Sequence, residues 1–135
     1  MENSFKYLKI FFILISFYFM PSNSFADQMK DLQLSNKITS QYEAGNLKKV
    51  EELLNGLSNE QLKMIWVSNL LLKYYDKSDL NSVVRLHEKL KDENLKQIWI
   101  SNILIQALQL KKCKIGRSFI GKLKDVNLRK IWKNN

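Results

Sequence analysis

A repeat of 33 residues is the feature of this 135-residue chain that constrains its fold most. The segments Leu62–Leu72 (LKMIWVSNLLL) and Leu95–Ile105 (LKQIWISNILI) carry similar residues in the same order. The same step separates the three tryptophans, Trp66, Trp99 and Trp132. Repeats of about 20 to 50 residues are typical of solenoids, because one unit cannot bury its apolar face alone and packs on its neighbours. We therefore expect an all-α fold, a right-handed α-solenoid of helix-turn-helix repeats.

Each unit is expected to contain two helices. In the second unit the first helix extends from about Glu60 to Tyr75, where apolar residues recur at helical spacing. It is apolar on nearly all sides, so we expect other helices to cover it on more than one side. The second helix carries a single apolar stripe and should form an outer layer. This stripe consists of Leu80, Val83, Leu86, His87 and Leu90.

Capping and turn residues separate these helices. Ser58 and Gln61 fit a capping box at the start of the first helix, in which Ser58 accepts a hydrogen bond from the amide of Gln61. Ser78 or Asp79 is expected to cap the second helix. In the first unit Gly45 supplies the break between the two helices, as a left-handed residue does after a helix C-terminus.

The chain divides into a leader and one domain. Residues 1–26 have the layout of a secretory signal peptide, with two lysines, the apolar run Ile10–Met20, and small or polar residues up to Ala26. We therefore predict export, to the periplasm or to the outside of the cell. The remainder, 27–135, is predicted to be an α-α repeat domain. Its repeats are 27–59, 60–92 and 93–125, followed by a partial closing helix at 126–135.

A helix-turn-helix unit of this length resembles the tetratricopeptide and related α-α repeats, and the resemblance extends over residues 27–135. The unit is one residue shorter than a standard tetratricopeptide and lacks its Gly, Ala and Pro signature positions. The pentapeptides IWVSN and IWISN also look like the Trp and Asn ladder of armadillo repeats. Here Trp66 and Asn69 stand closer together than in armadillo units, which also have a third helix. The resemblance implies a solenoid that binds a protein or an extended peptide.

The repeated Trp and Asn residues are the first candidates for partner binding: Trp66, Trp99, Trp132, Asn69 and Asn102. Two interpretations are open. In the first, the indoles pack between helices and each Asn bonds a backbone carbonyl or the Asn of the next unit, which fixes the stacking of the repeats. In the second, these side chains line a groove and bind a guest peptide. An amide buried without a partner costs roughly 1 to 3 kcal/mol, so either interpretation must supply one.

Positive charge is concentrated in the last third of the chain. From Lys111 to Lys133 nine Lys and Arg are opposed only by Asp125. Such a patch attracts acidic proteins, anionic lipid or nucleic acid, or it is a solvated face that keeps the protein soluble. Export makes nucleic acid an unexpected partner. The second helix of the third unit should present four candidate partner-binding cations to solvent: Lys114, Arg117, Lys122 and Lys124.

Histidine and cysteine, the residue types that most often bind metals or act in catalysis, occur at expected core positions in this chain. The only histidine, His87, stands where the other units have Leu54 and Ile120, and we expect it in the core with one hydrogen bond. The only cysteine, Cys113, likewise falls at a core position. Gly116 replaces a valine of the stripe, which is expected to let the closing helix approach closely.

No zinc-type spacing, phosphate-binding loop or catalytic pair is recognisable, and we expect neither a metal nor a cofactor. The sequence therefore predicts an exported, non-enzymatic scaffold that binds a protein or peptide, with an acidic partner favoured by its charge. The alternative is a peripheral membrane or envelope-surface protein that docks on anionic lipid through its basic C-terminal third.

Overall fold

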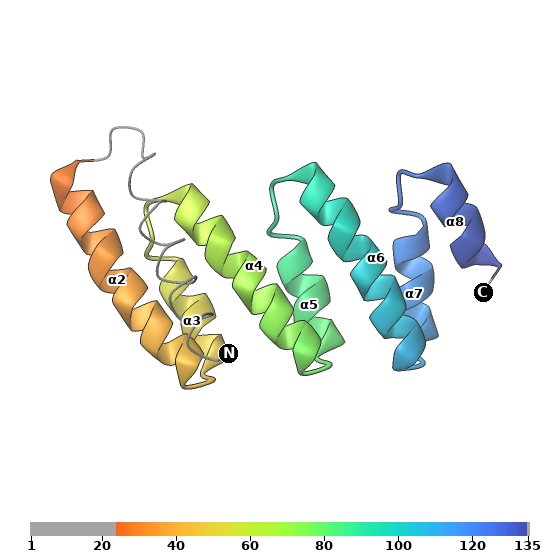
Figure 1. Cartoon of the computed structure of the whole chain (residues 1–135), viewed down its shortest axis with the longest axis horizontal. Coiled ribbons are helices and arrows are strands. Elements are labelled where there is room, and N and C mark those ends of the chain that lie inside the picture. Colours follow the sequence, from red (N-terminus) through yellow and green to blue (C-terminus); the bar gives the residue numbers. More distant parts are fainter. Residues whose placement is uncertain (1–23, 135) are drawn as a thin grey trace, which may run out of the picture. The chain divides into compact units, whose positions relative to one another are not determined.

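The computed structural model describes residues 24–134, and within them every regular element is an α-helix (Figure 1). The helices are α2 (Phe25–Glu43), α3 (Leu47–Leu54), α4 (Glu60–Asp76), α5 (Leu80–His87), α6 (Glu93–Gln109), α7 (Cys113–Ile120) and α8 (Val126–Lys133). The prediction of an all-α fold is confirmed. None of these helices is both long enough and apolar enough to cross a membrane. The predicted signal peptide lies outside the described residues except for its last three, 24–26.

The helices belong to two compact units, and the division falls inside α4, between Ile65 and Trp66. In the first unit α2 packs on α3. In the second unit α6 packs against both α5 and α7, and α8 packs against α7. Helices α3, α5 and α7 therefore each lie beside a longer helix, whereas α8 packs on the short helix α7.

A buried carboxylate organises the first unit. Asp31 on α2 is 1% exposed and accepts hydrogen bonds from the backbone amides of Ser58 and Asn59, both at 2.9 Å, and from the Ser58 hydroxyl at 2.8 Å. Because these amides precede α4 and have no helical partner, the carboxylate satisfies donors that would otherwise be left without one. Asp31 thus fixes the loop that leads into α4.

Gln97 on α6 does the same for a loop of the second unit. Its Oε1 accepts from the amide of Lys124 at 2.9 Å, and its Nε2 donates to the carbonyl of Lys122 at 3.2 Å. Gln97 occupies the position in the sequence repeat that Asp31 occupies in the first unit. The neutral amide of Gln97 therefore fixes the segment before α8, as the carboxylate of Asp31 fixes the segment before α4.

Helices α4, α6 and α8 begin at one kind of cap. The side chains of Asn59, Asp92 and Asp125 accept from the amides three residues further on, at 2.8, 2.7 and 3.0 Å. The prediction that Ser58 caps α4 is wrong, because its hydroxyl donates to Asp31 instead. Asp79, one of the two candidates, does cap α5, accepting from the amide of Ser82 at 3.2 Å.

Each long helix ends in a left-handed residue. Gly45, Ser78 and Lys111 have φ of 78°, 57° and 54°, and they are spaced at 33 residues. At all three places the next residue donates its amide to a carbonyl five residues back, which is the Schellman motif. The expected role of Gly45 is confirmed. At the two later turns the same backbone is formed by residues with a Cβ, which adopt it at a cost.

The apolar stripe of α5 forms a core, as its spacing predicted. Leu80, Val83 and Leu86 are each 0% exposed. His87 is also buried and meets the ring of Phe119 on α7 edge-on, with 5.6 Å between ring centroids. The expected hydrogen bond is absent, since neither ring nitrogen has a partner among the described residues.

The predicted core position of Cys113 is wrong, because this residue is exposed. It begins α7, and only the eight residues of α8 pack against that helix from the far side. By contrast, α5 has the 17-residue α6 beside it. A shorter covering helix leaves part of the α7 stripe open.

The three left-handed residues provide a direct test of backbone strain. Ser78→Gly and Lys111→Gly should each raise the free energy of unfolding by about 0.5 to 1 kcal/mol, because glycine adopts positive φ without a Cβ clash. Gly45→Ala should lower it by about 1 kcal/mol. Urea unfolding measures all three. Gly121→Ala is the control, since the φ of Gly121 is −64°, and an equal loss there would contradict the explanation.

His87 makes stability depend on pH. Burial lowers the pKa of His87 below its ordinary 6.5, opposed mainly by Glu88 at 3.8 Å and assisted by the positive charges of Lys122 and Lys96. Between 6.5 and the lowered value the unfolded chain binds a proton that the folded chain does not. The free energy of unfolding should therefore fall as pH drops below about 6.5, by up to about 1.4 kcal/mol per pH unit.

His87→Leu should remove this dependence, since leucine stands at the matching position of the first unit and does not titrate. The measurement is thermal unfolding of both proteins between pH 7.5 and pH 5. A wild type that loses no more stability than the variant over this range would show that His87 is not the cause.

Candidate protein-interaction surface

The three tryptophans that are candidates for partner binding lie in two different environments. Trp66 and Trp99 are 5% and 4% exposed. Trp99 meets the ring of Tyr75 edge-on, with 6.0 Å between centroids and 70° between planes. Trp132 on α8 is half-buried and lines a hollow in the surface. Only Trp132 therefore offers its ring to a partner without a change in packing.

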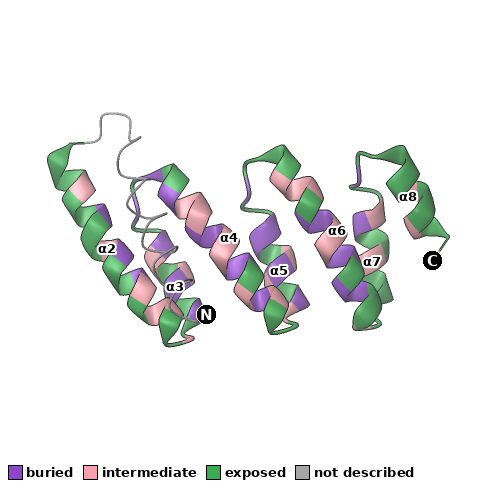
Figure 2. Ribbon diagram, in the orientation of Figure 1, coloured by how far each residue is buried: buried purple, intermediate pink, exposed green. Residues whose placement is uncertain are grey.

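The long helix α6 leaves several apolar side chains exposed. Ile98 on α6 is 58% exposed, and Ile105 and Leu108 on the same helix are also exposed. Asn102 lies between the two isoleucines in helical spacing and is half-buried. Figure 2 shows exposed positions continuing along α6. We call Ile98, Asn102, Ile105 and Leu108 the α6 row.

Asn69 on α4 is half-buried, like Asn102. It shares its helix with the exposed Leu72, so polar and apolar groups alternate on the accessible face of α4 as well. On α8 the exposed apolar residues are Val126, Leu128 and Ile131. Sequence periodicity missed these exposed apolar residues, because a helix that is apolar all round gives no signal for which side remains open.

Two of the four candidate cations form ion pairs within the described chain, and two do not. Lys122 pairs with Glu88 at 2.8 Å and lies over the ring of Phe119, with its ammonium 4.4 Å from the centroid. Lys124 pairs with Glu93 at 3.2 Å. Both lysines follow the end of α7 at Ile120, so the prediction that this helix carries them is wrong. They connect the loop after α7 to the end of α5 and the start of α6, and their charges are largely neutralised within the unit.

The pKa values of the two glutamates reflect these contacts. A hydrogen bond from Lys122 lowers the pKa of Glu88, and one from Lys124 lowers the pKa of Glu93. Both carboxylates are exposed, so the pairs are weak in energy, as surface ion pairs usually are.

Lys114 and Arg117 on α7 are exposed and form no ion pair with any described residue. Lys130 and Lys133 on α8 are likewise exposed and unpaired within the described chain. Arg129, in contrast, directs its guanidinium at the carbonyl of Leu123. Four cations on two packed helices thus remain without an internal counter-charge, and they are Lys114, Arg117, Lys130 and Lys133.

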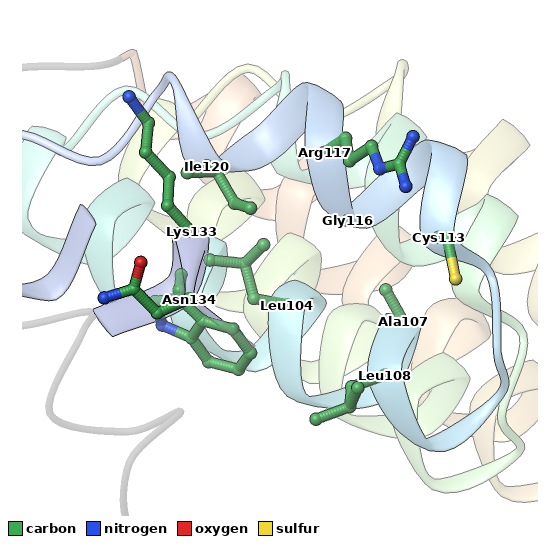
Figure 3. Close-up of a pocket in the computed structure, with 10 residues that line it drawn as sticks. Leu104, Ala107, Leu108, Cys113, Gly116, Arg117, Ile120, Lys133 and Asn134 are labelled. Carbon is green, nitrogen blue, oxygen red and sulfur yellow. The ribbon is translucent and has the colours of Figure 1, made fainter. Parts of the chain in front are cut away.

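A hollow lies among α6, α7 and α8, beside these cations (Figure 3). Its walls are apolar and come from Leu104 and Ala107 on α6 and from Gly116 and Ile120 on α7. Gly116 was expected to let the closing helix approach closely, but the space beside it stays open. The sequence already indicated missing side-chain volume here, because glycine replaces valine at this place in the repeat.

The described residues contain no cluster of three or more His, Cys, Asp or Glu placed to hold a metal ion. What this surface offers is exposed apolar area and unpaired positive charge. In protein interfaces, apolar contact supplies affinity and charge selects the sign of the partner.

Trp99 and Trp132 should respond differently to truncation. Trp99→Ala removes a buried ring and its contact with Tyr75, so it should lower the free energy of unfolding by about 3 to 5 kcal/mol. Trp132→Ala removes a half-exposed ring and should cost clearly less. Denaturant unfolding of both variants, with circular dichroism to monitor helix content, gives the comparison. Equal losses would contradict the assignment of Trp99 to the core.

Comparison with known proteins identifies no relative. The resemblance to helical-repeat families therefore rests on the repeated residues of this chain. No protein-family model, curated protein sequence or solved structure matches it.

Proposed function

We propose that residues 27–135 form a right-handed α-solenoid of 33-residue helix-turn-helix repeats, and that this solenoid is an exported, non-enzymatic scaffold for an acidic protein or peptide partner. The same step relates the left-handed residues Gly45, Ser78 and Lys111. It also relates the caps Asn59, Asp92 and Asp125. Turns and caps that recur with the sequence period support a repeated unit.

Helix lengths give further support. The helices α4 and α6 have 17 residues each, and α3, α5 and α7 have eight each. A long helix and a short one joined by a tight turn resemble the α-α repeats in architecture. Export follows from the leader-like residues 1–26.

The observation that carries the binding function is the α6 row, whose end at Leu108 lines a hollow together with the unpaired Arg117 and Lys133. Large contiguous apolar patches on a protein surface usually mark sites that contact another molecule. The nearby positive charges attract a partner of negative charge and raise its rate of encounter. Carboxylates of a protein or peptide fit both requirements, because the same chain can supply apolar and acidic side chains.

Charge reversal at α7 tests this function. Lys114→Glu together with Arg117→Glu should reduce capture of the partner about tenfold or more and weaken its salt dependence, because two unpaired cations become anions. Lys122 is left unchanged because it holds Glu88. The measurement is crosslinking capture from the exported fraction of the native source, with the captured protein identified by mass spectrometry.

The matched control is Lys77→Glu together with Lys89→Glu, which changes the net charge equally at exposed lysines outside the cluster. It should capture the partner nearly as well as the wild type. Equal losses in the two double variants would indicate a nonspecific effect of net charge. Binding to anionic vesicles with no protein captured would favour the lipid-docking alternative.

A further inference from the structure

The hollow among α6, α7 and α8 has a volume of about 390 Å³. Its apolar walls are Leu104, Ala107 and Ile120, and the ring of Trp132 also contributes to its lining. A volume of this size lies within the usual range for sites that bury a ligand group. The hollow is open to the surface and lies next to the exposed end of the α6 row at Leu108.

Two substitutions within the repeat create this space. On α5 the stripe has Leu80 and Val83, which are fully buried. The matching residues on α7 are Cys113, which is exposed, and Gly116. A smaller side chain stands at each place where the earlier helix fills its core.

The rim of the hollow is positive. Arg117 and Lys133 line it, and no Asp or Glu does so among the described residues. Figure 3 shows Arg117 near Cys113 on one side and Lys133 on the other side, beside Asn134. An apolar cavity with one unpaired cation on each side is complementary to an apolar group that carries negative charge on both sides.

We infer that this hollow binds a large apolar side chain of an acidic peptide segment, with flanking Asp or Glu residues placed toward Arg117 and Lys133. The inference rests on the proposed function and specifies the chemistry of the partner. Burial of one large apolar side chain supplies enough free energy to act as an anchor, as central apolar residues do in protein interfaces. The flanking carboxylates select the segment and orient it in the hollow.

A defined probe tests the inference. It is a fluorescein-labelled nonapeptide with a central phenylalanine and two acidic residues on each side of it, measured by fluorescence anisotropy with the full chain. A second probe has alanine for the phenylalanine, and a third has serine for every acidic residue. Both should bind about tenfold more weakly than the first or worse.

Gly116→Leu fills the hollow and should weaken binding of the first probe about tenfold or more. A Cβ at this position meets the Ala107 Cβ at 3.6 Å, an ordinary contact, and Gly116 lies inside a helix that leucine favours. The matched control is Gly121→Leu. It adds the same side chain at an exposed glycine with no atom within 4 Å of the added Cβ, and it should bind the probe as the wild type does.

Cys113 gives a second readout that needs no substitution. Its thiol lines the hollow and is exposed, so a maleimide should react with it readily. The first probe should slow this reaction several-fold, and the alanine probe should not at the same concentration. This result locates the probe in the hollow even if Gly116→Leu fails to fold.

The outcomes separate the two proposals. If the phenylalanine and alanine probes bind equally and neither protects Cys113, the hollow is not a binding site, although an acidic partner can still contact the cations. If the serine probe binds as well as the first, the assignment of acidic flanks is overturned. If charge reversal at Lys114 and Arg117 leaves partner capture intact while the probe still protects Cys113, the proposed function fails and the hollow remains a peptide site.

Discussion

Burial of the short helices against the long ones is the interaction on which the rest of this structure depends. An eight-residue helix is not stable alone in water, because nucleation costs more than so few hydrogen bonds return. Helix α5 therefore exists because its stripe is removed from water, with Leu80, Val83 and Leu86 fully buried. The single cysteine excludes an internal disulfide, and the described residues hold no metal cluster. Apolar packing and the hydrogen bonds of the loops hold the helices in place.

This packing also requires the loops between helices to be held in a fixed conformation. Hydrogen bonds to backbone groups in these loops do so. Asp31 and Gln97 differ in charge and length, yet each accepts from an amide in the loop that precedes the next helix. In the same way glycine, serine and lysine all adopt the left-handed turn that ends a long helix. The loop hydrogen bonds and the left-handed turns recur from unit to unit, although the residue types that form them change. An amide left without a partner costs free energy whichever side chain serves as its acceptor, so the hydrogen bond is kept while the residue changes.

The sequence predicted what depends on local periodicity and missed what depends on neighbours. The helices, the α5 stripe and the turn at Gly45 follow from spacing and propensity, and they were predicted correctly. The cap of α4 was wrong because Asp31, 27 residues from Ser58, engages the serine hydroxyl. The engagement of Lys122 and Lys124 was missed because Glu88 and Glu93 lie outside α7. The exposure of Cys113 was missed because the repeat was assumed to cover every unit equally.

The same unequal covering explains why the candidate site lies on α6, α7 and α8. In repeat proteins the outer face of a terminal unit is usually polar, which suffices for solubility. Here α8 exposes Val126, Leu128 and Ile131, and each exposed apolar group costs free energy that a polar residue would avoid. Lys130, which lies among them, and Lys133 offset the loss of solubility without covering this area. Under the proposed function, a bound partner would cover both these apolar residues and the unpaired charges.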